Sequence, residues 1–370
     1  MGEKRIRRIG ILTGGGDCPG LNAVIRAVAK TAQGIYGIEV IGILDGYWGL
    51  VSEGFRVLRN EDVSGILNLG GTILGTSRVD PFKEAFELGR LSSPAEDWDY
   101  VKGVLNRHSI QGIVAVGGEG TLRVAVRAAR AGIPIVGVPK TIDNDVGETD
   151  VTFGFDSAVS IVMDALDRLH TTAMSHHRAM VVEVMGRTAG WLALYAGVAG
   201  GGDVLLLPEF PYHEEIVFER VRERSRSGKR FSIIVASEGA KAAGGAVICS
   251  DKDDGGGRKI LGGIGKFLAD RIEAATGIET RETVLGYLQR GGSPTAYDRV
   301  LATEFGHSVV ELLIAGKTGE MVALKGDRIV SVPIEKAVSE IKLVPREHPL
   351  VDAALSVGTC FGVPESVWKS

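Results

Sequence analysis

The stretch VPKTIDND, residues 138–145, comes at the end of an apolar run that is typical of a buried strand. It combines a lysine, a threonine and two carboxylates two residues apart. Alternate residues of an extended segment face the same way, so we expect Asp143 and Asp145 on one side. Such a carboxylate pair suits metal binding or proton removal from an alcohol. A polar turn that caps the next helix would show the same pattern.

Two other apolar runs end in glycine-rich turns that precede helical patterns. Residues 6–13 lead into GGGDCPG at 14–20, and residues 110–116 lead into GGEGT at 117–121. Glycines let backbone N–H groups approach a phosphate at a helix N-terminus. A tight turn without a ligand gives the same pattern, and the GxGxxG spacing of dinucleotide-binding proteins is missing. These repeated units predict an open parallel sheet with a site along its carboxyl edge.

Glycine with a charged residue recurs after predicted strands in both halves of the chain. Examples are MGR at 185–187 and SEG at 237–239. We therefore predict an α/β fold with two similar three-layer α/β/α domains, whose mostly parallel sheets face each other across a cleft. One domain is expected at 1–154 plus about 289–339, and the other at 155–288 plus about 340–370.

Length and composition agree with this organisation. The chain has 370 residues, of which 44% are hydrophobic, and this length suggests two domains. A net charge of −4 argues against nucleic acid as a partner. Three scattered cysteines do not suggest a disulfide framework. The N-terminal sequence resembles neither a signal peptide nor a membrane span, so we expect a cytoplasmic protein that does not bind membranes.

Six ordered motifs across nearly the whole chain resemble those of the 6-phosphofructokinases. They are GGDCPGLN at 15–22, GGEGT at 117–121, PKTIDND at 139–145, VEVMGR at 182–187, SEG at 237–239 and GYLQRGGSP at 286–294. The likeness is greatest to the branch in which a lysine precedes TIDND, which mixes ATP and pyrophosphate users. It implies an ATP-dependent, Mg²⁺-requiring enzyme of glycolysis. The enzyme would transfer the γ-phosphoryl group to the 1-hydroxyl of fructose 6-phosphate, giving fructose 1,6-bisphosphate and ADP.

The same resemblance implies roles for individual residues. Asp143 matches the general base and Arg187 the arginine that steadies the transferred group, with Thr141 and Asp145 beside them. The matches on the nucleotide side are Gly15, Gly16, Arg78, Val79, Gly118, Glu119, Gly120 and Thr121, with Glu119 as the residue for the metal. The matches on the sugar-phosphate side are Thr141, Ile142, Asp143, Met185, Gly186, Arg187, Glu238, Tyr287, Leu288, Gln289 and Arg290. Arg178 and Arg281 match arginines that reach the sugar 6-phosphate from a neighbouring subunit, which implies a homodimer or homotetramer with shared active sites.

The identity of the donor depends on two residues that point in different directions. Gly120 leaves room for the α-phosphate of ATP, where pyrophosphate users of this family have aspartate. Lys140 is typical of pyrophosphate users. We weigh Gly120 more heavily and predict ATP as the donor, with a pyrophosphate-dependent enzyme as the alternative. A turn that requires positive φ would also explain a glycine at position 120, without any ligand. The GGEGT loop alone also resembles NAD and lipid kinases, a reading that leaves PKTIDND unexplained.

Overall fold

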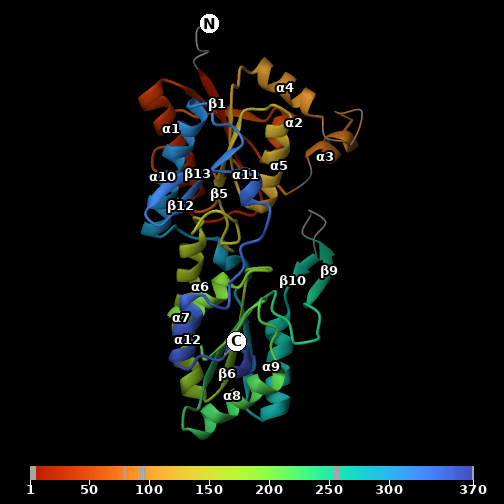
Figure 1. Cartoon of the computed structure of the whole chain (residues 1–370), viewed down its shortest axis with the longest axis vertical. Coiled ribbons are helices and arrows are strands. Elements are labelled where there is room, and N and C mark those ends of the chain that lie inside the picture. The colour runs from red at the N-terminus through yellow and green to blue at the C-terminus, as the bar shows by residue number, and fades with distance from the viewer. Residues whose placement is uncertain are drawn as a thin grey trace. The chain divides into compact units, whose positions relative to one another are not determined.

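The computed structural model describes residues 6–78, 81–89, 91, 93, 95, 97–253 and 259–368. They form two compact units (Figure 1). The first unit comprises Met1–Thr141, Val146–Asp156 and Arg290–Ile341, and the second comprises Ile142–Asp145, Ser157–Gln289 and Lys342–Ser370. The short piece Ile142–Asp145 belongs to the second unit, although the residues on both sides of it belong to the first. The predicted domain bounds place this piece in the first domain.

The first unit contains a seven-stranded sheet in the order β13-β12-β5-β4-β1-β2-β3. Its strands are β1 (Arg8–Thr13), β2 (Glu39–Ile43), β3 (Phe55–Val57), β4 (Ile113–Gly117), β5 (Ile135–Pro139), β12 (Glu320–Lys325) and β13 (Arg328–Pro333). The five central strands are parallel, and β3 and β13 pair antiparallel at the edges. β4 and β5 are buried along their whole length, as expected where helices cover both faces of a parallel sheet.

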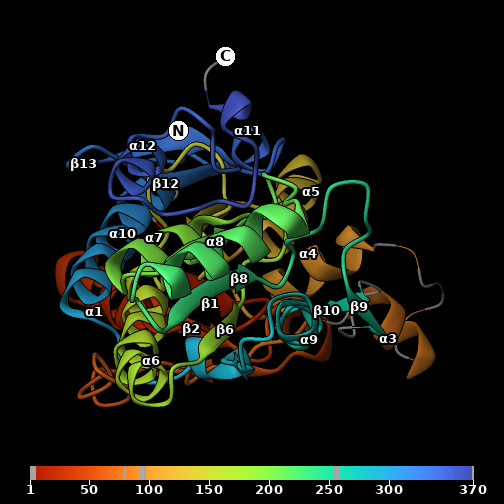
Figure 2. The ribbon, with the colours of Figure 1, turned by 90° about the horizontal axis from the view of Figure 1, so that it is seen from below.

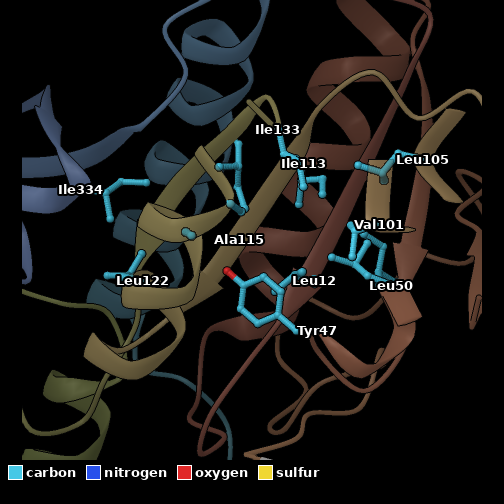
Figure 3. Packing of buried hydrophobic residues seen from close by; sticks show 14 of the residues in the cluster. Leu12, Tyr47, Leu50, Val101, Leu105, Ile113, Ala115, Leu122, Ile133 and Ile334 are labelled. Carbon is cyan, nitrogen blue, oxygen red and sulfur yellow. The ribbon is translucent and has the colours of Figure 1, made fainter. Parts of the chain in front are cut away.

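Helices cover both faces of this sheet. One face carries α1 (Leu21–Tyr36) and α10 (Ala296–Ile314), which pack together. The other face carries α2 (Trp48–Ser52), α4 (Trp98–Arg107), α5 (Glu119–Arg130) and α11 (Ile334–Ala337), with α3 (Pro81–Glu87) against α2. Figure 3 shows the core on this side, where Leu12 and Ile113 of the sheet pack among buried side chains such as Leu122 of α5.

The strand order changes direction between β1 and β4. β1 is followed by β2 on one side, whereas β4 is followed by β5 on the other. In an open α/β sheet, connections that diverge in this way leave a ligand site at the carboxyl ends of the two strands. The segments at this point are residues 14–20 and the start of α5, which are two of the predicted site segments.

The second unit contains a four-stranded, fully parallel sheet in the order β11-β6-β8-β7. Its strands are β6 (Ala179–Val184), β7 (Val204–Leu206), β8 (Ser232–Ser237) and β11 (Thr280–Val284). One face packs against α8 (Glu214–Arg226) and α9 (Ile264–Thr276), and Figure 2 shows α8 lying over β8. α7 (Trp191–Ala199) packs on the other face, with α12 (Pro349–Ser356) against it. α6 (Phe155–His176) precedes β6, and two 3₁₀ turns span Gly286–Arg290 and Glu365–Val367.

These observations confirm the predicted α/β class with two domains of mostly parallel sheets. That the domains face each other across a cleft stays a prediction. A separate antiparallel pair consists of β9 (Cys249–Asp253) and β10 (Lys259–Leu261), and residues 254–258 between the two strands lie outside the described ranges. None of the helices in the described ranges has the length and apolar character needed to span a lipid bilayer.

Candidate functional site

Three cationic side chains of the first unit converge on the loop after β1. Lys140, which follows β5, donates a hydrogen bond to the carbonyl oxygen of Gly16, and Arg290 Nη1 donates one to the carbonyl oxygen of Asp17 at 3.1 Å. A Cβ built on Gly16 would lie 2.5 Å from Arg290 Nη1 and 2.8 Å from Arg78 Nη2. Lys140 and Arg290 are only 3% and 8% exposed. Partly desolvated cations interact more strongly with an anion than exposed ones do, so this loop suits a phosphate.

The N-terminus of α5 lies beside this loop. A Cβ built on Gly14 would lie 2.6 Å from Thr121 Oγ1, so the first turn of α5 packs directly against the loop after β1. The N-cap residue, Gly118, has no side chain to bond the first N–H groups of the helix. Such N–H groups and the helix dipole favour a bound anion. The loop and the helix start therefore form one candidate phosphate site, which we call the donor site.

Gly120 is not required by the backbone. It lies within α5 and is not among the residues with positive φ, so the explanation of this glycine by positive φ is wrong. A Cβ built on Gly120 meets no protein atom within 4 Å. Because the fold has room for a side chain at this position, the glycine is better explained by a bound ligand that needs the space.

Glu119 is the residue expected to serve the metal. Its carboxylate forms an ion pair with Arg123, one helical turn later. Within the described residues there is no group of three His, Cys, Asp or Glu side chains that could hold a metal ion. Mg²⁺ commonly takes one or two protein carboxylates and fills its shell with water and substrate phosphates. A single carboxylate at the start of α5, beside the donor site, fits that donor set.

In the second unit, predicted site residues meet at the carboxyl ends of β6 and β8. The backbone N–H of Arg187 donates to Glu238 Oε1 at 3.2 Å, and that of Met185 donates to Gln289 Oε1 at 3.2 Å. A Cβ on Gly239 would overlap the carbonyl oxygen of Arg187, so the two turns are tightly packed. Arg187 has a φ of 50°, which is uncommon for a non-glycine residue and occurs often at functional sites. This packing fixes Arg187 relative to Glu238.

Glu238 interacts electrostatically with Asp143 of the same unit. Burial, and then repulsion by Asp143, raises the pKa of Glu238 to about 7. Asp143 is 5% exposed. Two carboxyl groups in one poorly solvated place resist simultaneous ionisation. At neutral pH, Glu238 is therefore protonated for part of the time and can donate as well as accept a hydrogen bond.

We expect the Glu238→Gln variant to gain stability relative to the parent as the pH rises from about 4.5 to about 7. Glu238 ionises near 4.5 in the unfolded chain and near 7 in the folded one, so between these values its ionisation favours unfolding. The difference in free energy of unfolding should grow by on the order of 2 kcal/mol. Urea unfolding of both proteins at pH 5 and pH 8 measures this difference; equal differences at the two pH values would show that the pKa is not raised.

The segment 138–145 passes from the first unit to the second between Thr141 and Ile142. Ile142 is fully buried, backbone included, so it offers no exposed surface to a substrate. Lys342 holds the end of the segment, because its backbone N–H donates to the carbonyl oxygen of Asp145 at 2.9 Å and its Nζ donates to Asn144 Oδ1 at 2.8 Å. The chain that carries Asp143 is therefore fixed just after this residue by Lys342 of the same unit.

Arg178 and Arg281 lie at the other edge of the second sheet. Arg178 immediately precedes β6, and Arg281 is the second residue of β11. Arg187 follows the carboxyl end of β6, which is six residues long. At about 3.3 Å per residue, roughly 20 Å of strand separates Arg178 from Arg187. The structure does not bring the two arginines together with the other sugar-side residues of the same chain.

The remaining predicted residues differ in where they lie. Tyr287 and Leu288 are 73% and 68% exposed. Arg290, which the resemblance groups with the sugar side, lies in the first unit beside Gly16. Val79 lies outside the described residues. The sequence prediction did not include Glu279, which contacts both Arg178 and Arg281; its place two residues before Arg281 on an extended segment was the available signal.

Comparison with known proteins finds one family over most of the chain. The family described as phosphofructokinase matches residues 8–313. The chain is 50% identical over 355 residues to "ATP-dependent 6-phosphofructokinase 3" of Bacteroides thetaiotaomicron, covering 96% of this chain and 100% of the relative. It is 51% identical over 343 residues to "Pyrophosphate--fructose 6-phosphate 1-phosphotransferase" of Amycolatopsis methanolica, covering 92% and 97%. A solved phosphofructokinase of Saccharomyces cerevisiae superposes with a TM-score of 0.76 at 31% identity, covering 90% of this chain and 45% of the yeast chain.

Proposed function

Because the chain belongs to the phosphofructokinase family, we propose that it transfers the γ-phosphoryl group of ATP to the 1-hydroxyl of fructose 6-phosphate. The products are fructose 1,6-bisphosphate and ADP. The observation that carries the choice of ATP is the open space at Gly120, at the start of α5 in the donor site. An assay of purified protein with fructose 6-phosphate and either ATP or pyrophosphate tests the proposal.

On this proposal, the donor site binds the phosphates of ATP. Phosphoryl transfer depends mainly on positioning and on neutralising charge. Backbone N–H groups of α5 and the cations Lys140, Arg78 and Arg290 supply both. Glu119 would hold Mg²⁺, directly or through water, and the ion would neutralise charge on the transferred phosphates. The Arg123 guanidinium keeps the Glu119 carboxylate oriented along the helix.

The acceptor is activated by Asp143. The 1-hydroxyl oxygen forms a bond to the γ-phosphorus while the bond from that phosphorus to the bridging oxygen of ADP breaks, and the hydroxyl proton passes to the Asp143 carboxylate. Arg187, fixed by the turn after β6, stabilises negative charge on the phosphoryl group in flight. On this proposal Glu238, at the same strand ends, binds a sugar hydroxyl. Gln289 is fully buried with its amide bonded to Met185 and Gly286, so it would hold the turn rather than contact the sugar.

Pyrophosphate is the second candidate donor, and one observation favours it. Lys140 is 3% exposed and is bonded to the loop after β1, where its charge acts on any phosphate in the donor site. A lysine can hold a free phosphate as a point charge. It is compatible with both donors, whereas a carboxylate at position 120 would exclude ATP. We therefore retain ATP as the proposed donor.

We also propose that active sites are shared between copies of this chain in a homodimer or homotetramer. Arg178 and Arg281 are about a strand length away from Arg187 in their own chain, which is too far for one sugar phosphate to bridge. The 6-phosphate that they bind therefore belongs to a substrate in a neighbouring subunit.

The three cysteines are free thiols, which supports a reducing compartment such as the cytoplasm.

Replacing Arg178 by alanine should raise the fructose 6-phosphate concentration needed for half-saturation by about tenfold or more, because a charged phosphate contact is lost. The requirement for ATP should change little. Steady-state kinetics with each substrate varied in turn measures both values.

Mixed oligomers supply the control for shared sites. Arg178→Ala chains co-assembled with Asp143→Asn chains should recover activity. Some active sites then combine the unmutated Asp143 of one chain with the unmutated Arg178 of the other. Full activity in a verified monomer would contradict the shared site.

A further inference from the structure

Arg178 and Arg281 are joined by one carboxylate. Glu279 Oε2 lies 2.8 Å from Arg178 Nε, and Glu279 Oε1 lies 2.5 Å from Arg281 Nη2. The Arg178 guanidinium contributes most to lowering the pKa of Glu279, so the carboxylate is ionised at neutral pH. Each oxygen of Glu279 thus takes one guanidinium group, and Arg281 Nη1 also lies 3.3 Å from Glu273 Oε2.

Strand pairing produces this arrangement. Thr280 pairs with Ala179 in the register of β11 and β6, so the preceding residues, Glu279 and Arg178, lie opposite each other. Arg281 is two residues after Glu279 in an extended segment and lies on the same side. The three side chains therefore meet at the amino-terminal edge of the sheet because of backbone geometry alone.

A carboxylate held by two arginines occupies N–H donors that a bound phosphate would use. Guanidinium groups bind carboxylate and phosphate with the same paired N–H donors. All three side chains are partly exposed, at 32% for Arg178, 39% for Glu279 and 50% for Arg281, so an incoming anion is able to reach them. A phosphate dianion that reaches the arginines must either displace the carboxylate or bind beside a like charge.

We propose that Glu279 is an internal competitor for the substrate phosphate at Arg178 and Arg281, and that it sets the half-saturation for fructose 6-phosphate. The inference rests on the proposed function, because it takes the 6-phosphate to be the anion that these arginines bind. Glu279 weakens the binding of the sugar phosphate and keeps the two cations paired while no phosphate is present. Glu279 affects how tightly the sugar phosphate binds and does not touch the reacting atoms.

The test is the Glu279→Gln variant, which removes the charge and keeps the shape. The half-saturation concentration for fructose 6-phosphate should fall about threefold or more, a size that suits a partly exposed ion pair. The turnover number and the half-saturation for ATP should stay within about twofold of the parent, because the donor site is unchanged. A second variant, Glu279→Ala, should shift the half-saturation in the same direction.

Two further variants separate this role from general effects of charge and structure. Glu282→Gln makes the same charge change three residues later, on the strand face opposite Arg281, and should change the half-saturation less than half as much. In an Arg178→Ala background, Glu279→Gln should change the half-saturation less than twofold. One of the two arginines for which Glu279 and the phosphate compete is already missing there.

The outcomes are distinct. A higher half-saturation in both Glu279 variants would show that the carboxylate orients the arginines. An unchanged half-saturation would show that the carboxylate neither competes with the phosphate nor orients the arginines. Each of these results overturns the inference. If the parent protein itself does not phosphorylate fructose 6-phosphate with ATP or pyrophosphate, the proposed function fails first, and the parent assay alone reveals this.

Discussion

Replacement of Asp143 by asparagine should reduce the turnover number by about 100- to 10,000-fold, the usual contribution of a general base. Asparagine has nearly the same shape but cannot accept the proton of the 1-hydroxyl. Binding of fructose 6-phosphate should remain largely intact, because the contacts that fix this segment run through Lys342 to Asn144 and Asp145. Repulsion on Glu238 should also decrease, since Asp143 contributes to its raised pKa.

Steady-state kinetics measures the loss of turnover, and calorimetric titration with fructose 6-phosphate measures substrate binding separately. Asp145→Asn, two residues further along the same segment, is the matched control and should lose much less activity than Asp143→Asn. A turnover number within threefold of the parent, about 0.65 kcal/mol of barrier, would rule out Asp143 as the base.

Replacement of Gly120 by aspartate should reduce ATP use by about 100-fold or more, because a like charge placed against the α-phosphate costs several kcal/mol. The fold itself should tolerate the change, since a Cβ at this position meets no protein atom within 4 Å and φ is not positive. A pyrophosphate molecule ends before the α-phosphate position, so pyrophosphate use could appear with help from Lys140.

Gly120→Asn is the matched control because it adds nearly the same volume without the charge. It should lose less ATP activity than the aspartate variant, and both should keep the melting temperature of the parent within a few degrees. Unchanged ATP kinetics in Gly120→Asp would show that the α-phosphate does not lie near the start of α5.

The fold was predictable where apolar runs end abruptly in a glycine-rich or polar turn. The strands that became β1, β4 and β5 were recognisable because buried parallel strands read as continuous apolar sequence followed by a turn. The assignment of Ile142–Asp145 to the second unit was not predictable in this way. It depends on contacts with residues far along the chain, such as Lys342, and these leave no periodic signal.

The candidate site was predictable as a set of motifs but not as an arrangement. The sequence pattern could not show that Arg290 lies beside Gly16, because 273 residues separate it from its hydrogen-bond partner Asp17. The positive-φ explanation for Gly120 was reasonable for a glycine-rich turn, and it is wrong because α5 begins one residue earlier, at Glu119. The pairing of Glu279 with Arg178 became visible only through strand register, because 101 residues separate the two in the chain.

The most direct test of the account is the phosphorylation of fructose 6-phosphate by the purified parent protein, with magnesium present and with ATP or pyrophosphate at matched concentrations. Formation of fructose 1,6-bisphosphate should be faster with ATP, and phosphate-31 NMR should show ADP as the second product. Faster turnover with pyrophosphate would contradict the account and would make Lys140, rather than Gly120, the residue that indicates the donor.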